Sequence, residues 1–435
     1  MKITPRPIVS FLASLLLIGL GTRTWGLDVL SYQLELHPNI PEQSVRGQVT
    51  IQFLCDRSSL TMAAGALVID EVTGGNVKSY QKVGSNLQVE LVAVENGVQE
   101  LVVSYHGKPR QGLIFDTKKD HAYTVYFTSQ WMVCNEEIHD RASISMDIVT
   151  PSGKECIASG ELSEQLDQGT TTLHRWQQGY ETPAYTYGFA IGSFEVVREE
   201  AGEARLTYYG AGIGADTLRR LFEETPTILK FLEEKSGIPY VQRSYSQVVI
   251  GSHYQEMSGF AVLSEAYVAS VLKDSSEIHL TTHELAHQWW GNMITCRDLS
   301  HFWLNEAFAV YMASAFHERR FGREKYLSDI ALYKNIYDRL IERGQDKPLI
   351  MSRWVATRDN RHVVYYKGAY VLHLLREHLD DEPFWAGIKL YSSRYFGRSV
   401  ETADFQRAME DASGSDLSPF FEQWVYGLPT PSSKH

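Results

Sequence analysis

The feature that constrains the fold most is a change in hydrophobic period near residue 200. From Asp28 to about Val197, apolar and polar residues alternate, as they do at Leu30, Tyr32 and Leu34. Proline and glycine turn signals separate these alternating runs. Alternation with a period of two predicts strands that bury one face, and hence an antiparallel sheet or sandwich.

Beyond this region the period becomes helical. Between Thr217 and Lys235, apolar residues such as Leu218, Leu221 and Phe222 recur at spacings of three and four, as on the buried face of a helix. The charged, glycine-bearing segment at 199–203 separates the two periods and is the predicted domain boundary.

We therefore expect an α+β protein of two domains, an antiparallel β-sandwich followed by a mostly helical domain. The length of 435 residues agrees with this division, since one domain typically takes ~150 residues. The predicted segments are a signal peptide at 1–26, the β-sandwich at 27–200, the helical domain at 201–428 and a flexible tail at 429–435.

The N-terminus has the pattern of a secretory signal peptide. Lys2 and Arg6 precede an apolar run at 8–20, which is shorter than the ~20 residues of a membrane-spanning helix. Cleavage near Gly26 would export the protein to the periplasm or the extracellular space, without stable membrane insertion. An uncleaved N-terminal anchor is the alternative.

Charge and cysteine content exclude other classes of protein. The formal net charge is −12, so the chain lacks the basic footprint of a nucleic-acid-binding protein. Four cysteines in so long a chain are too few for a disulfide scaffold. Cys134 and Cys156 could pair in an oxidising compartment, and the sequence leaves this open.

The string HELAH at 283–287 carries the clearest chemistry. Residues four apart share one face of a helix, so His283 and His287 can bind one Zn²⁺ while Glu284 is held beside them. Ser275 and Ser276 offer a helix N-cap before the motif, and Gly291 offers a stop after it. The bare motif also fits a surface helix with two solvated histidines.

The surroundings of the motif favour a zinc site. A catalytic zinc has three protein ligands and one open position. In metzincins the third ligand is a histidine six residues after the second histidine of the motif, and a glycine stands three residues after that second histidine. Here these two positions hold Met293 and Trp290. A second predicted helix starts at 303–309 and carries Glu306, with eighteen residues between this acid and His287. This acid would complete a set of two histidines and one glutamate, as in thermolysin.

These motifs together resemble the aminopeptidase N family of zinc metallopeptidases, a gluzincin family that includes leukotriene hydrolase. HELAHQWWGN at 283–292 and WLNEAFA at 303–309 are the most specific matches. The resemblance covers nearly all of 28–428 and implies that the helical domain is thermolysin-like. Further segments resembling the family lie at 28–53, 134–137, 141–162, 183–195 and 364–369.

The resemblance also implies roles for individual residues. His283, His287 and Glu306 would hold one zinc ion per chain, and Glu284 would be the general base. Tyr365, two residues before a Lys-Gly pair, matches the tyrosine that stabilises the oxyanion of the tetrahedral intermediate. A phenol donor in that place contributes ~2.7–4 kcal/mol to catalysis, as does a single oxyanion-hole donor.

The expected substrate anchor departs from the family pattern. Family members usually carry G-x-M-E-N before the histidines, and its glutamate binds the free α-ammonium of the substrate. Aligning on Met257 places Ser258 at the anchoring acid, followed by Gly259. Glu256 or Glu136 could supply the missing charge, and Gln130 is the rough counterpart of the family's second amine-binding residue.

The chain also ends about where the family's thermolysin-like domain stops. We expect it to be a short form without the C-terminal helical domain of longer members, and therefore to have a more open cleft.

The predicted function is hydrolysis of peptide bonds by zinc-activated water, as an aminopeptidase acting on peptides. Because Ser258 replaces the expected acid, the first alternative is a zinc peptidase that prefers internal bonds or blocked N-termini. The second is a non-catalytic peptide-binding protein, although a binder needs neither Glu284 nor Tyr365. The sequence does not predict an oligomeric state.

Overall fold

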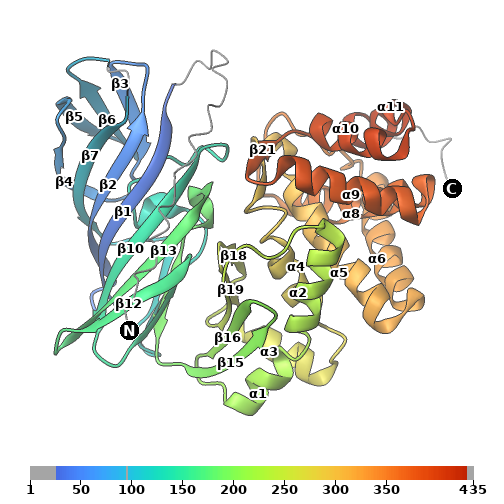
Figure 1. The fold of residues 1–435 in the computed structure, drawn as a ribbon, viewed down its shortest axis with the longest axis horizontal. Coiled ribbons are helices and arrows are strands. Elements are labelled where there is room, and N and C mark those ends of the chain that lie inside the picture. The colour runs from blue at the N-terminus through green and yellow to red at the C-terminus, as the bar shows by residue number, and fades with distance from the viewer. Residues whose placement is uncertain (1–25, 95–96, 429–435) are drawn as a thin grey trace, which may run out of the picture.

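The computed structural model describes residues 26–94 and 97–428. Residues 1–25 of the predicted signal peptide and the predicted tail at 429–435 lie outside the described residues. A β-rich half and a helical half lie side by side, with a smaller sheet between them (Figure 1).

The first half is built on a seven-stranded sheet. Its neighbouring strands pair antiparallel, except that β1 and β10 run parallel. The alternation predicted from the sequence is present, since β10 alternates between buried and half-buried side chains along most of its length. In sheet order the strands are β12 (Glu161–Asp167), β13 (Thr171–Pro183), β10 (Arg141–Pro151), β1 (Asp28–Asn39), β2 (Ser44–Leu54), β7 (Gln99–Gly107) and β4 (Val68–Thr73).

Two smaller sheets complete this half and share one hydrophobic core with the large sheet. The four-stranded sheet consists of β11 (Glu155–Ala158), β14 (Phe189–Gly192), β9 (His121–Thr124) and β8 (Leu113–Asp116). The three-stranded sheet consists of β3 (Ser59–Ala63), β6 (Asn86–Leu91) and β5 (Val77–Val83). The short turns η1 (Thr128–Gln130) and η2 (Ala184–Thr186) connect strands.

A five-stranded sheet lies between the two halves. Its central strands β16, β17 and β19 are parallel and are buried on both faces, as parallel strands usually are. Val248 and Val249 show this directly, because the first packs into the core of the β-rich half and the second into the helical core. The strands are β15 (Glu195–Ala201), β16 (Ala204–Gly210), β17 (Ser244–Val249), β19 (Phe260–Leu263) and, at one edge, β18 (Gln255–Met257).

Helices form the rest of the second half, and α5 is buried along most of its length. The helices are α1 (Ala215–Leu221), α2 (Thr225–Ser236), α3 (Glu265–Lys273), α4 (His279–Ala286), α5 (Trp303–Phe321), α6 (Arg323–Glu342), α7 (Arg358–His362), α8 (Gly368–Leu379), α9 (Asp381–Tyr395), α10 (Thr402–Ser413) and α11 (Ser418–Phe421). Shorter elements are η3 (Leu299–His301), the π-helical turns η4 (Val363–Lys367) and η5 (Glu422–Tyr426), and the strand pair β20 (Ile294–Cys296) and β21 (Arg398–Val400).

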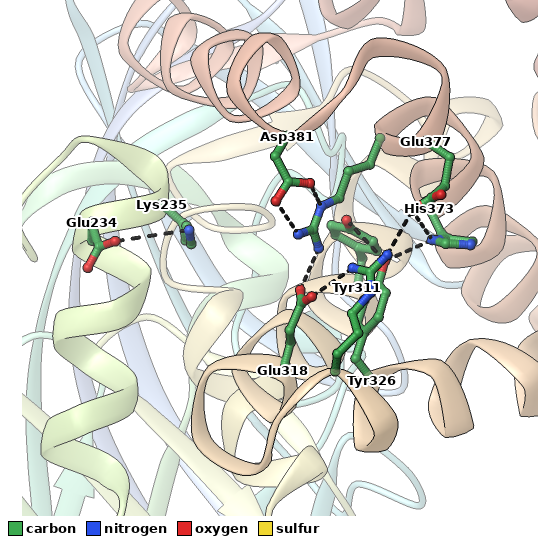
Figure 2. Close-up of polar contacts among 10 residues, drawn as sticks. Glu234, Lys235, Tyr311, Glu318, Tyr326, His373, Glu377 and Asp381 are labelled. Carbon is green, nitrogen blue, oxygen red and sulfur yellow. Dashed lines mark hydrogen bonds and ion pairs between the residues drawn. The ribbon is translucent and has the colours of Figure 1, made fainter.

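A buried arginine fixes the C-terminal end of α5. The guanidinium of Arg376 makes two bonds to Asp381, of 2.7 and 2.8 Å, and one to Glu318 of 2.6 Å. Arg323 joins Glu318 to Glu377. Figure 2 shows these three carboxylates, from α5, α8 and α9, gathered round the two guanidinium groups. Such paired, charge-assisted bonds hold α5 against its neighbours, and α5 carries Glu306 near its other end.

The predicted fold class, an N-terminal β-sandwich followed by a helical domain, is confirmed. The charged segment at 199–203 contains the turn between β15 and β16, where Gly202 has a φ of +63°. The exact domain boundary stays a prediction. All four cysteines are buried and free. No helix among the described residues has the length and apolar character needed to cross a membrane.

Candidate metal centre and active site

The three predicted zinc ligands lie together. His283 belongs to α4, His287 directly follows that helix, and Glu306 lies in the first turn of α5. The two Nε2 atoms are 3.1 Å apart, and each is 3.5 Å from Glu306 Oε2. Two ligands ~2.1 Å from a tetrahedral ion are separated by roughly 3.4 Å. The three donor atoms therefore fit one face of a tetrahedral zinc site.

The electrostatics of this group favour a bound cation. All three side chains are buried, and Glu306 Oε2 has no hydrogen-bond donor. Burial opposes a positive charge on His287, but Glu306 and the neighbouring acids Glu256 and Glu284 raise its pKa to about 10. Burial also opposes the negative charge on Glu306, yet His287 and His283 lower its pKa to about 2. The residues present thus fit a divalent metal ion.

The backbone after α4 orients His287. Its Nδ1 lies 3.0 Å from the carbonyl oxygen of Trp290, so a proton on Nδ1 leaves Nε2 free to bind a metal. Gly291 allows the backbone to pass close to the ring of His287. It has a φ of +138°, and a Cβ atom there would lie only 2.8 Å from His287 Nδ1. The glycine predicted as a helix stop therefore also shapes the site.

Glu284, the predicted general base, lies against the metal ligands. Its carboxylate, that of Glu256 and a ring nitrogen of His287 all lie within 4.8 Å of one another. The Oε2 atom of Glu284 is buried without a partner. Burial raises the pKa of Glu284 well above its usual value, and the nearby Glu256 raises it further. A carboxylate whose pKa is raised accepts a proton more readily than an ordinary one does.

Glu256 occupies the site, whereas Ser258 does not. Glu256 is the central residue of β18, the edge strand of the middle sheet. Successive side chains of a strand point to opposite faces, so Glu256 faces the metal ligands while its two neighbours face away. Burial raises the pKa of Glu256 to about 7, with Glu306 adding to the effect and His287 opposing it.

This placement corrects the expectation that a serine stands where the anchoring acid would be. Ser258 and Gly259 form the tight turn between β18 and β19, where Gly259 has a φ of +85°. Ser258 Oγ accepts a hydrogen bond from Gln242, and its N–H donates to the carbonyl of Thr186. The serine is therefore committed to holding the turn.

The other predicted substrate residues have structural partners. The carbonyl of Met257 accepts hydrogen bonds from Gln288 and Asn292, which tie β18 to the segment after α4. Glu136 is exposed and accepts from the N–H of Ser129. Gln130 packs against glycines of the β-rich half. Of the two candidate acids, the structure therefore brings Glu256, and not Glu136, to the metal ligands.

Tyr365 reaches the site from η4. Its ring is nearly parallel to that of His283, with 6.1 Å between the ring centres and 14° between the planes. Single π-helical turns occur often at functional sites. Burial raises the pKa of Tyr365 well above its usual value, as do the charges of Glu306 and Glu256. The phenol is therefore protonated at neutral pH and is a hydrogen-bond donor.

Two further tyrosines border the site and were not predicted. Tyr126 has a φ of +51°; its N–H donates to Gln255 and its hydroxyl to the carbonyl of Tyr254. Tyr185 donates to the carbonyl of Gly291. Both come from the β-rich half. The only sequence signal is that Tyr126 lies four residues before Gln130, the rough counterpart of the family's second amine-binding residue.

Residues 220–424 match the model described as the peptidase family M1 domain. The matched residues cover most of the helical half. The M1 match includes His283, Glu284, His287, Glu306 and Tyr365, and the resemblance to aminopeptidase N found in the sequence is confirmed.

Curated proteins similar to this chain are named as aminopeptidases. The leucyl aminopeptidase of Saccharolobus solfataricus is 21% identical over 92% of this chain and 53% of its own length. Aminopeptidase N of Escherichia coli is 28% identical over 63% of this chain and 33% of its own length. The chain thus spans about half the length, or less, of the curated relatives it matches.

Solved structures share the complete two-domain fold. An M1 zinc metallopeptidase from Deinococcus radiodurans superposes with a TM-score of 0.79 at 23% identity, over 93% of this chain and 95% of that one. A mutant of a Deinococcus radiodurans M1 enzyme, bound to the substrate Tyr-Ser-Ala, gives a TM-score of 0.80 at 22% identity, over 94% and 96% of the two chains. The predicted cofactor, Zn²⁺, agrees with the M1 family and with the ligand geometry.

Proposed function

We propose that this M1 protein is a zinc aminopeptidase that removes residues from the free N-termini of peptides. The observation that carries the proposal is the meeting of three metal ligands with two further buried carboxylates, Glu284 and Glu256. A hydrolase needs the first of these acids for proton transfer. An aminopeptidase needs the second to bind the substrate ammonium.

The chain's own residues divide the chemistry between them. When zinc is bound, it supplies a Lewis acid that makes water a nucleophile at neutral pH. Glu284 takes the proton of the attacking water and delivers it to the leaving amine, which its raised pKa permits. Tyr365 donates its phenolic proton in a hydrogen bond to the oxygen on which negative charge develops.

Glu256 sets the position of cleavage. A carboxylate facing a primary ammonium makes a charge-assisted hydrogen bond, and a peptide held by its first amino group presents its first peptide bond to Glu284. With Glu256 beside Glu284 and His287, the alternative of a peptidase for internal bonds or blocked N-termini is not favoured. The unpartnered, buried Glu284 oxygen argues against a non-catalytic binder.

The test compares three peptides with the zinc-loaded protein: one with a free N-terminus, its N-acetylated form, and an internally quenched peptide blocked at both ends. Faster turnover of the free-amine peptide, by at least tenfold, is expected. Equal or faster cleavage of the blocked peptides would contradict an aminopeptidase, and the absence of turnover on all three would contradict a peptidase.

Tyr365→Phe is expected to keep zinc and fold but to lower kcat about 10²- to 10³-fold, because it removes a donor used mainly in the transition state. Steady-state kinetics on the free-amine peptide measure the effect. Tyr366→Phe, one residue further along η4, is the matched control and should leave kcat near the wild-type value. An effect of Tyr365→Phe on KM alone would contradict the oxyanion role.

Glu256→Gln is expected to weaken the preference for a free N-terminus about 10- to 100-fold, since a hydrogen bond to a charged group contributes ~1.5–3 kcal/mol. The measured quantity is the ratio of kcat/KM for the free and acetylated peptides. Ser258→Ala is the control and should leave this ratio unchanged. If Ser258→Ala alters the ratio and Glu256→Gln does not, the anchor is at the turn after all.

We also propose that the protein is exported to the periplasm or the extracellular space. Support comes from Lys2, Arg6 and the apolar run at 8–20, a pattern typical of a signal peptide. N-terminal sequencing of the protein from extracytoplasmic fractions should find a start near residue 27. Recovery of a chain that retains Met1 only in the cytoplasm would contradict export.

A further inference from the structure

The continuous helix formed by α7 and η4 presents three different faces. Its buried residues pack into the domain. A second row, spaced by four, lines a groove of about 420 Å³ against α6 and consists of Arg358, His362 and Tyr366. A third row, also spaced by four, consists of Arg361 and Tyr365. Because residues four apart lie on one side of a helix, Arg361 lies one turn before Tyr365 on the side facing the metal ligands.

Electrostatics independently place Arg361 near the cleft. The hydroxyl of Tyr126 borders the site; burial raises its pKa, and the charges of the site acids Glu256, Glu284 and Glu306 raise it further. Arg361 acts on the same hydroxyl in the opposite direction. The guanidinium of Arg361 therefore lies within electrostatic range of the Tyr126 hydroxyl, as do the three site carboxylates.

Arg361 is also available to a ligand. Its side chain is exposed, and within the described part of the chain no hydrogen bond or ion pair engages its guanidinium. The nearest acid in sequence, Asp359, is bound instead by Arg343 at 2.8 Å. A planar guanidinium that is free of partners has the donor geometry to bind a carboxylate through two parallel hydrogen bonds.

The acidic residues of the cleft suggest a role for Arg361. Glu256, Glu284 and Glu306 lie together in the cleft, and the negative charge they carry repels a substrate carboxylate close to the scissile bond. We propose that Arg361 is a specificity-determining residue that binds a substrate carboxylate, so that the enzyme prefers short peptides that carry one near the cleaved bond.

This inference rests on the proposed aminopeptidase function and names its substrate class. The carboxylate has two sources: an acidic side chain on one of the first two residues, or the C-terminus of a dipeptide. Three substrate pairs separate them: Glu-Ala-amide against Gln-Ala-amide, Ala-Glu-amide against Ala-Gln-amide, and free Ala-Ala against Ala-Ala-amide. Each pair differs by one carboxylate and very little in shape.

The test measures the ratio of kcat/KM within each pair for the zinc-loaded wild type, Arg361→Gln, Arg361→Glu and Arg358→Gln. The wild type should favour the acidic member of at least one pair about three- to fivefold, the range of a solvent-exposed charge pair. Arg361→Gln should abolish that preference, Arg361→Glu should reverse it, and 1 M salt, about the ionic strength at which screening reaches ~3 Å, should reduce it.

Arg358→Gln is the matched control, because it removes the same charge one turn earlier but from the row that faces α6. If Arg358→Gln lowers the ratio as much as Arg361→Gln does, the effect is a general field and the proposal is overturned. Identical ratios in wild type and Arg361→Gln for all three pairs would also overturn it.

A binding measurement separates this proposal from the proposed function. The same six peptides are titrated by calorimetry into zinc-loaded Glu284→Gln, with and without Arg361→Gln. A carboxylate preference in Kd that depends on Arg361 would support the inference even if the wild type cleaves none of these peptides. Equal Kd values for the two members of every pair would overturn the inference. Such a result would not contradict the cleavage of neutral peptides.

Discussion

Glu284→Gln should fold, keep its zinc and lose about 10²- to 10⁴-fold in kcat. The amide fills the same space as the carboxylate but cannot accept the proton of the attacking water, and general acid–base catalysis contributes this much to rate. KM should change little, because the removed group acts on the water and not on the ground-state peptide.

The same substitution also carries a stability prediction. The raised pKa of Glu284 shows that burial beside Glu256 disfavours its charged form, so the uncharged amide should not lower the Tm of the metal-free protein at pH 7. Metal content, Tm and kcat are measured together. The matched control is Glu277→Gln, an exposed change just before α4, which should leave all three unchanged. Retention of a tenth or more of wild-type kcat by Glu284→Gln would mean that another group is the base.

The metal centre could be predicted from the sequence because its geometry depends on local helical structure. The spacing of His283 and His287 fixes them on one side of α4 and its C-terminal end, and Glu306 lies in the first turn of the next long helix, α5. The one long-range contact that this prediction requires is the packing of α4 against α5. The change in hydrophobic period likewise predicted the two halves of the fold, since a period follows directly from backbone geometry.

The substrate anchor could not be placed because it depends on the register of a three-residue strand. Aligning on Met257 placed the expected anchor at Ser258, two positions after Glu256, the acid that lies beside the metal ligands. A strand this short has too few alternations to fix its register from the sequence. The contact that decides it, between β18 and the residues after α4, joins segments about thirty residues apart.

Other misses have similar causes. Helix α4 begins at His279 and not at the predicted cap, because Asp274 accepts the hydrogen bonds of Ser276 and holds that serine in a turn. Tyr126 comes to the site from the β-rich half, more than 150 residues before the metal ligands. Such long-range contacts arise from domain packing, which local sequence patterns do not encode.

His283→Ala and His287→Ala should each lose stoichiometric zinc and, with it, essentially all peptidase activity. A catalytic zinc site has three protein ligands, and each substitution leaves only two. Each also leaves the buried Glu306, at 2% exposure, with one histidine in place of two, and a buried charge without its partner is costly. Metal analysis after dialysis, with kcat on the free-amine peptide, measures both losses.

The control for these variants is His279→Gln. His279 lies one turn before His283 on the same helix and is engaged by the hydroxyl of Tyr333 at 2.8 Å, so its replacement by another hydrogen-bonding side chain should retain full zinc. Full occupancy in both alanine variants would refute the assigned ligand set.

Thermal unfolding adds a second measurement, because a ligand at a thousand times its Kd stabilises the native state by about 4 kcal/mol. Chelation should therefore lower the Tm of the wild type and of His279→Gln by several degrees, and leave the Tm of the two alanine variants where it was, since they have no zinc to lose.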